Sequence, residues 1–209
     1  MTNQPQKKKS APDVEKMREA VAAFLKAAGQ DPAENPLLKE TPSLVADAWA
    51  HEFLDGCAKD PRALLAKELL PYACPNTDSG CSCRAPVAVK NIRFTGVCPH
   101  HLLPWSGTAH VAYIPNEKIV GYGAIVQVVE AMAHRLVLQE NLTWDIAGVL
   151  QDVLDPFGVL VRLEASQPCL TLRGECQRGA VTASEAFFIS ELAEDPRGFE
   201  RLLCKALDR

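Results

Sequence analysis

The order of extended and helical segments after residue 85 constrains the fold most. Residues 85–97 and 107–115 are rich in β-branched and aromatic side chains and are predicted to be strands. Helical patterns follow over 124–138 and 142–154, before further strands are expected at 157–165, 169–175 and 180–190, ahead of a short C-terminal helix. Long helices between antiparallel-looking strands indicate an α+β fold rather than a doubly wound parallel sheet.

The N-terminal third follows a different, helical pattern. Apolar residues recur at steps of three and four between Asp13 and Ala28, and a second such stretch covers 43–53, with Thr41 and Pro42 as its start. We therefore expect three regions: a flexible tail at 1–12, an N-terminal helical region at 13–70, and a catalytic domain at 71–209 that holds the strands.

Charge and composition narrow the class of partner. The net charge is −4 and no basic face is visible, so nucleic acid is not an expected partner. The lysine-rich start, MTNQPQKKKSAP, has no apolar stretch behind it, which argues against a signal peptide or a membrane span. We expect a cytoplasmic protein whose eight cysteines are thiols or metal ligands, and whose partners are small molecules or further copies of itself.

The motif Cys98-Pro99-His100-His101 places one thiol and two imidazoles at the end of a predicted strand. Cysteine and histidine three residues apart can both reach one zinc ion, which prefers sulfur and nitrogen ligands. Cys169 is the best candidate for a third ligand, and three protein ligands would leave a fourth position for water. The alternative is that Cys98 is a buried core thiol and the histidines cap a strand.

A longer stretch around this motif resembles a known family. CPHHLLPWSGTAHVAYIPNEKIVGYG is similar to the signature of GTP cyclohydrolase I, and QENLT at 139–143, CLTLRG at 169–174 and ETP at 40–42 continue the match in order. The resemblance covers roughly residues 36 to 190. It implies a tunnelling fold, in which antiparallel strands and helices of several subunits assemble into a ring with active sites at the subunit interfaces.

The resemblance also implies a chemistry. In this family, zinc-bound water adds to C8 of GTP, the imidazole ring opens with release of formate, and the product closes to a dihydropterin triphosphate. Cys98, His101 and Cys169 fall on the zinc ligands, and His100 falls on a histidine used in proton transfer. Gln139 and Glu140 fall on the pair that reads guanine. A carboxylate there can accept N–H bonds from adjacent ring and exocyclic nitrogens.

Four cationic positions of the family pattern are missing here. An arginine and a lysine after ETP are replaced by Leu44 and Asp47, and a later lysine and arginine by Ala124 and Gln127. Gly123 replaces a serine at the same place, and only Arg173 remains as a cation. A charge-assisted contact contributes ~1.5–3 kcal/mol, so the loss of four predicts weak binding of a triphosphate.

Gln167 is the second departure, because the family places a catalytic histidine there, two residues before the zinc cysteine. Glutamine holds a water or a ring nitrogen by hydrogen bonds but donates no proton as an acid. We assign Gln167 to the catalytic positions beside His100, with either a catalytic or a positioning role, and expect the zinc-assisted hydrolytic step to be retained. Separately, Cys74, Cys81 and Cys83 form a cysteine-rich loop that is either a second metal or redox site or only a turn.

Three hypotheses follow. The leading one is a zinc hydrolase that acts on a purine-like or pterin-like ring without a triphosphate, held by Glu140, Gln139 and Arg173. The second is a GTP cyclohydrolase I with relocated phosphate anchors, for which Lys90, Arg93 and Arg135 are candidates. The third is a non-catalytic ring that binds a purine or a protein and keeps zinc for structure. An open fourth zinc position facing Glu140 would separate the enzymes from the third.

Overall fold

The computed structural model describes residues 11–73, 85–191, 193 and 195–208. The chain divides into two compact units, Met1–Lys59 and Asp60–Arg209. The boundaries that we predict at 12/13 and 70/71 stay predictions, and residues 1–10 of the expected tail lie outside the described residues.

The first unit is helical, as its periodicity predicts. Its elements are α1 (Val14–Ala27), η1 (Pro36–Leu38), α2 (Thr41–Ala48), the π-helical turn η2 (Trp49–Phe53) and η3 (Asp55–Ala58). Asp13 caps α1, because its side chain accepts a hydrogen bond from the backbone N–H of Lys16 at 3.2 Å. Pro42 lies in the first turn of α2, where a missing backbone N–H costs little.

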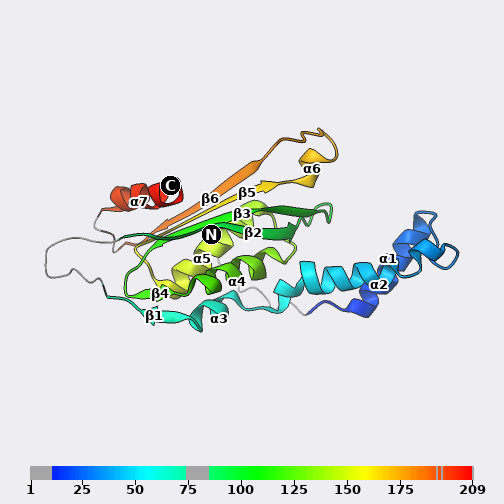
Figure 1. The fold of residues 1–209 in the computed structure, drawn as a ribbon, viewed down its shortest axis with the longest axis horizontal. Coiled ribbons are helices and arrows are strands. Elements are labelled where there is room, and N and C mark those ends of the chain that lie inside the picture. The colour runs from blue at the N-terminus through cyan, green and yellow to red at the C-terminus, as the bar shows by residue number, and fades with distance from the viewer. Residues whose placement is uncertain (1–10, 74–84, 192, 194, 209) are drawn as a thin grey trace. The chain divides into compact units, whose positions relative to one another are not determined.

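The second unit combines two antiparallel sheets with helices. Its elements are α3 (Pro61–Ala66), β1 (Leu69–Pro71), β2 (Val87–Val97), β3 (Pro104–Ile114), β4 (Lys118–Val120), α4 (Tyr122–Ala133), α5 (Gln139–Leu154), β5 (Gly158–Ser166), α6 (Pro168–Thr171), β6 (Thr182–Ile189) and α7 (Pro196–Asp208). The main sheet has the order β2-β3-β5-β6, and β1 pairs with β4 (Figure 1). The predicted α+β class is confirmed.

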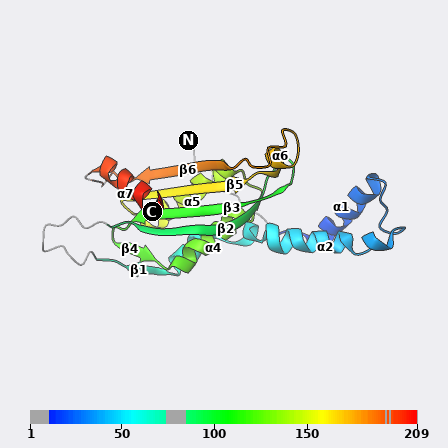
Figure 2. The same ribbon diagram turned by 45° about the horizontal axis from the view of Figure 1, so that its top comes forward.

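The main sheet has a different core on each face. Helices α4 and α5 cover one face and α7 the other (Figure 2). Alternation along β3 explains this, since Ala109, Val111 and Tyr113 pack in the core that includes α4 and α5, whereas Ala112 and Ile114 pack with α7. The phenol oxygen of Tyr113 also accepts a hydrogen bond from the N–H of Val120 at 3.3 Å, which ties β4 to the main sheet.

Gly107 marks a close approach inside the main sheet. A Cβ at this position would lie 2.2 Å from the carbonyl oxygen of Glu164 on the neighbouring β5, so no larger residue fits there without moving the strands. The pairing of β3 with β5, which sets the end of the sheet discussed below, therefore depends on this glycine.

Two predicted elements need correction. Residues 169–175 do not form a strand, because Pro168 starts the short helix α6 and Gly174 then adopts a positive φ of 58°. The proline has no N–H to give to a sheet, and β6 already occupies the free edge of β5. The helix expected over 124–138 ends at Ala133, and the chain then runs beside β2 before α5 begins.

None of the helices in the described part of the chain is both long enough and apolar enough to span a membrane. The predicted cytoplasmic location stays a prediction.

Candidate functional site

The candidate site is built at one end of the main sheet. Strands β2 and β5 both run antiparallel to β3, so their carboxyl ends lie at the same end of the sheet. Cys98 directly follows β2, and Cys169 lies three residues beyond the end of β5. The two predicted zinc cysteines therefore leave the sheet in the same direction, with β3 between their strands.

A tight turn positions the Cys98 motif. The backbone N–H of Cys98 donates to the carbonyl of Leu103 at 3.1 Å, and the N–H of Leu102 donates to the carbonyl of Cys98 at 2.9 Å. Cys98 is 9% exposed, whereas His100 and His101 are exposed, with ring centroids 6.5 Å apart. The turn thus buries the thiol and leaves both imidazoles accessible.

The start of α5 lies beside this turn. Val97 and Leu136 form an isolated β-bridge, and the N–H of Val137 donates to the carbonyl of Val97 at 3.0 Å. This contact places the segment that leads into Gln139 next to the residue before Cys98. Glu140, the second residue of α5, is exposed.

The third segment, which leads to Cys169, is joined to α5 by side chains. The side-chain amide of Gln167 donates to the side-chain oxygen of Gln139 at 2.9 Å. Gln139 is only 5% exposed, and it also bonds to Leu163 on β5 and Thr182 on β6. The structure therefore brings the segments of Cys98, Gln139 and Gln167 to one end of the sheet.

The donor set fits zinc in chemical type, because two thiols and an imidazole are among the ligands that zinc prefers. Within the described residues, however, no group of three or more His, Cys, Asp or Glu side chains is arranged to hold a metal ion. Cys169, like His101, is exposed in this structure. The zinc ligands therefore stay a prediction, and Cys74, Cys81 and Cys83 lie outside the described residues.

The positions of the missing cations are mostly at the surface. Leu44 is 66% exposed on α2 and Asp47 is exposed on the same helix. On α4, Gln127 is exposed, Ala124 is buried, and a Cβ at Gly123 would meet no described atom within 4 Å. The first two turns of α4 therefore carry no charged side chain, and the Glu68 carboxylate lies near Gly121 at their start.

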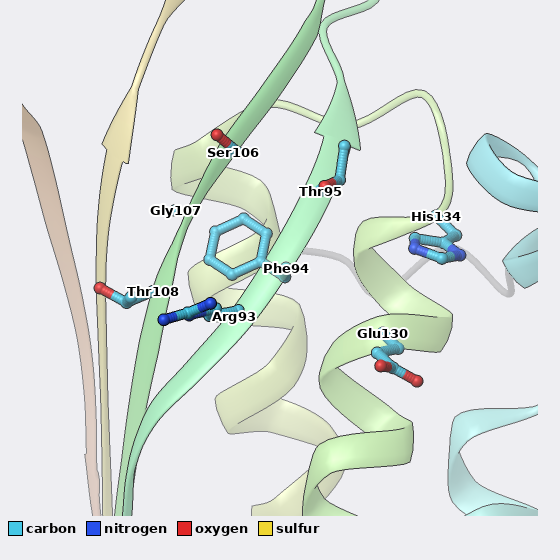
Figure 3. Close-up of a pocket in the computed structure, with 8 residues that line it drawn as sticks. All are labelled: Arg93, Phe94, Thr95, Ser106, Gly107, Thr108, Glu130 and His134. Carbon is cyan, nitrogen blue, oxygen red and sulfur yellow. The ribbon is translucent and has the colours of Figure 1, made fainter.

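Arginines elsewhere give mixed support as alternative phosphate anchors. Arg173 is exposed after α6. The guanidinium of Arg135 donates from Nε to the carbonyl of Ala131 at 3.0 Å, which turns it back onto α4. Arg93 lines a cavity of about 510 Å³ over β2, β3 and α4. Figure 3 shows Glu130 and His134 on the α4 side of that cavity, so an acidic group shares it.

Sequence reasoning missed several residues that hold the site together. Thr182 and Ser184 on β6 and Thr143 on α5 form hydrogen bonds that fix the start of α5. Nothing in the sequence signals them, because each contact joins residues about 40 positions apart.

The family model and the curated relatives agree with the resemblance. The family model described as GTP cyclohydrolase I matches residues 17–205. The chain is 41% identical to the GTP cyclohydrolase 1 of Chlorobium phaeovibrioides, over 91% of this chain and 81% of that protein. It is 41% identical to that of Leifsonia xyli, over 83% and 86%. Among solved structures, the archaeosine synthase QueF-Like in the apo form is 21% identical, with a TM-score of 0.42, over 49% of this chain and 92% of that one.

Proposed function

The chain belongs to the GTP cyclohydrolase I family, and we propose that it is a zinc-dependent hydrolase acting on a purine-like or pterin-like ring that lacks a triphosphate. One observation carries the choice of substrate. The first two turns of α4, where the family pattern has cations, are open at Gly123 and carry no charged side chain at Ala124 or Gln127.

Glu140 is the residue that we propose binds the ring. Its carboxylate is exposed at the start of α5, where the positive end of the helix dipole favours an anion. The carboxylate can accept two N–H bonds from neighbouring ring and exocyclic nitrogens, a geometry that guanine-type rings offer. Removal of Glu140 would leave those N–H groups without partners, at a cost of ~1–3 kcal/mol or more.

Cys98, His101 and Cys169 are the residues that would hold zinc. A zinc ion held there would supply Lewis-acid activation of water near neutral pH. Binding requires the exposed His101 and Cys169 side chains to turn toward Cys98, which the common direction of their segments allows. His100, the exposed neighbour of His101, is the side chain that would transfer a proton to and from the ring.

The charge balance supports a substrate without phosphates. A triphosphate carries several negative charges, and each charge-assisted contact contributes about 1.5–3 kcal/mol. Of the cationic positions in the family pattern that lie in the second unit, Arg173 is retained, while Ala124 and Gln127 carry no charge. Phosphates would therefore gain little at these positions.

GTP itself is the second candidate substrate. The curated relatives at 41% identity are named GTP cyclohydrolase 1, and the cavity lined by Arg93 supports a relocated anchor. Glu130 in the same cavity argues against it, because a carboxylate repels phosphate.

A side-by-side turnover assay tests the proposal. The zinc-loaded protein is offered guanine, 8-oxoguanine, guanosine and GTP, and loss of ultraviolet absorbance and formate release are followed. We expect an unphosphorylated ring to be turned over and GTP to be a poor substrate. Efficient formate release from GTP alone would overturn the proposal in favour of the second candidate.

We also propose that copies of the chain associate into a ring. Within the described chain, β2 with 11 residues and β6 with 8 residues each pair with another strand on one side only, apart from the single bridge between Val97 and Leu136. Long unpaired edges of this kind can pair with a strand of another chain. An edge-to-edge contact between copies would cover both and close a cyclic assembly.

A further inference from the structure

The side-chain amide of Gln139 is surrounded by hydrogen-bond partners within the protein. Its Nε2 donates to the carbonyl of Leu163 at 3.2 Å and to the carbonyl of Thr182 at 3.1 Å. Its Oε1 accepts from Nε2 of Gln167 at 2.9 Å and lies 2.6 Å from the Thr182 hydroxyl, whose one proton is shared with the carbonyl of Ala165 at 3.1 Å. Both N–H donors of the amide are therefore used within the protein, and protein atoms lie on both acceptor sides of its oxygen, which leaves no place for a ligand.

The surroundings fix which way this amide faces. The two backbone carbonyls only accept hydrogen bonds, so the Gln139 side chain must turn its NH₂ group toward them. Its oxygen then faces residue 167, and that residue must be a donor. Glutamine meets this requirement with its own NH₂ group, whereas a carboxylate would not.

The same helix turn is tied to β6 by a second contact. The hydroxyl of Thr143 donates to the backbone carbonyl of Gln139 at 2.7 Å and lies 2.6 Å from the Ser184 hydroxyl. Among the described residues, Leu138 makes no side-chain cap to α5. The start of α5 is therefore anchored by a hydrogen-bond network, which consists of Gln139, Gln167, Thr182, Thr143 and Ser184.

We propose that Gln167 is a positioning residue, which donates to Gln139 and so fixes the first turn of α5 that presents Glu140, and that it takes no part in proton transfer. Gln139 is then a structural residue and does not read the ring, which is left to Glu140. The anchoring part stands on the hydrogen bonds alone, and the effect on ring binding rests on the proposed function.

Three variants test whether residue 167 acts as a hydrogen-bond donor to Gln139 or as an acid that donates a proton. Gln167→Glu keeps the size but sets a carboxylate oxygen against the Gln139 oxygen. Gln167→His keeps an N–H donor and adds a group that can act as an acid. Gln177→Glu, on an exposed residue after α6, is the control for the added negative charge.

Hydrogen exchange of the ligand-free protein tests the anchoring. We expect Gln167→Glu to speed exchange of the Leu142 and Thr143 amides about tenfold, since a lost hydrogen bond and a facing pair of acceptors both favour local opening. Gln167→His and Gln177→Glu should stay within about twofold of the unmodified protein. Unchanged exchange in Gln167→Glu would overturn the proposal.

Kinetics with the accepted ring compound test the absence of proton transfer. Gln167→Glu should raise KM about tenfold with little change in kcat, and Gln167→His should leave the shape of the pH profile unchanged. A fall in kcat at constant KM, or a new limb in the pH profile of Gln167→His together with a higher kcat, would overturn the proposal. If no ring compound is turned over at all, the proposed function fails, while the exchange result still decides the anchoring.

Discussion

The first turns of α4 and α5 differ in how firmly hydrogen bonds hold them in place. Both helices begin, among the described residues, without a side-chain cap, at Gly121 and Leu138. The first turn of α5 is anchored by hydrogen bonds to β5 and β6. The first turn of α4 has an exposed Tyr122 and open space at Gly123.

The difference shows which of the two helix starts is held by buried polar contacts. Buried hydrogen bonds hold residues in place because breaking them leaves unsatisfied groups in the interior. The α5 start, which presents Glu140, has such a network, so its geometry is fixed before any ligand arrives. The first two turns of α4 carry no cation, and a Cβ at Gly121 would lie 3.5 Å from the Glu68 carboxylate, so the α4 start offers a phosphate neither positive charge nor a preformed cradle.

The largest expected effect is at the metal ligands beside the α5 start. The purified protein should contain about one zinc per chain, and Cys169→Ala should remove both the metal and turnover, because two protein ligands hold zinc poorly. Metal analysis of the purified protein measures this. Cys176→Ala, on an exposed cysteine after α6, is the matched control and should keep its zinc. Full zinc in Cys169→Ala would contradict the ligand assignment.

The assembly state bears on the comparison of the α4 and α5 starts, since a ring would allow side chains of a second copy to reach either helix start. We expect light scattering at micromolar concentration to give a mass several times that of one 22.8 kDa chain, because β2 and β6 have unpaired edges. A monomer mass would show that the two edges are tolerated as they are.

A positive charge added near the start of α4 should create a phosphate contact there. Gln127→Arg adds a guanidinium at an exposed position and should raise GTP affinity about tenfold or more, since a charge-assisted contact contributes ~1.5–3 kcal/mol. Binding of guanosine should not change. Titration calorimetry with both ligands measures this, and Gln30→Arg on the first unit controls for net charge. An equal gain for guanosine would indicate a general effect rather than a phosphate contact.

His110 differs from Gln139, whose side-chain amide is hydrogen-bonded, and we expect a smaller effect from it. Its Nδ1 is buried without a hydrogen-bond partner among the described residues, and burial lowers the pKa of this imidazole below 6.5, with Arg162 and Lys90 adding to the effect and Glu164 opposing it. The unfolded chain therefore binds the proton more tightly, and stability should fall as the pH drops through about 6.5.

Thermal unfolding between pH 7.5 and 5.5 measures this effect. His110→Gln removes the titration and should make the Tm less sensitive to pH, by no more than about 2–4 °C, the shift that ~1 kcal/mol produces in a chain of this size. His51→Gln, on an exposed histidine of the first unit, is the control. An identical pH dependence in His110→Gln would show that this imidazole titrates alike in both states.

Much of the fold could be predicted from local patterns. The helix at Val14–Ala27 and the strands at Val87–Val97 and Gly158–Ser166 follow periodicities that involve only neighbouring residues. The strand expected at 169–175 was wrong because a β-branched and apolar composition does not reveal whether a sheet edge is available.

The motif at Cys98 and the family resemblance picked out residues whose segments the structure gathers at one end of the sheet, and that this end is the active site stays a prediction. They did not reveal that Gln167 bonds to Gln139, because this contact joins residues 28 positions apart and depends on the orientation of one amide. Nor could they show that the buried Thr143 would also hold the start of α5 in place.

The most direct test of the account is the affinity of the zinc-loaded protein for guanosine and for GTP, measured by titration calorimetry together with Glu140→Ala. The account predicts that GTP binds no more tightly than guanosine, and that Glu140→Ala binds neither, since the ring contact supplies the affinity and the α4 start supplies none. Binding of GTP more than about a hundredfold tighter than guanosine, equivalent to ~2.7 kcal/mol, would show that phosphate anchors exist and would contradict it.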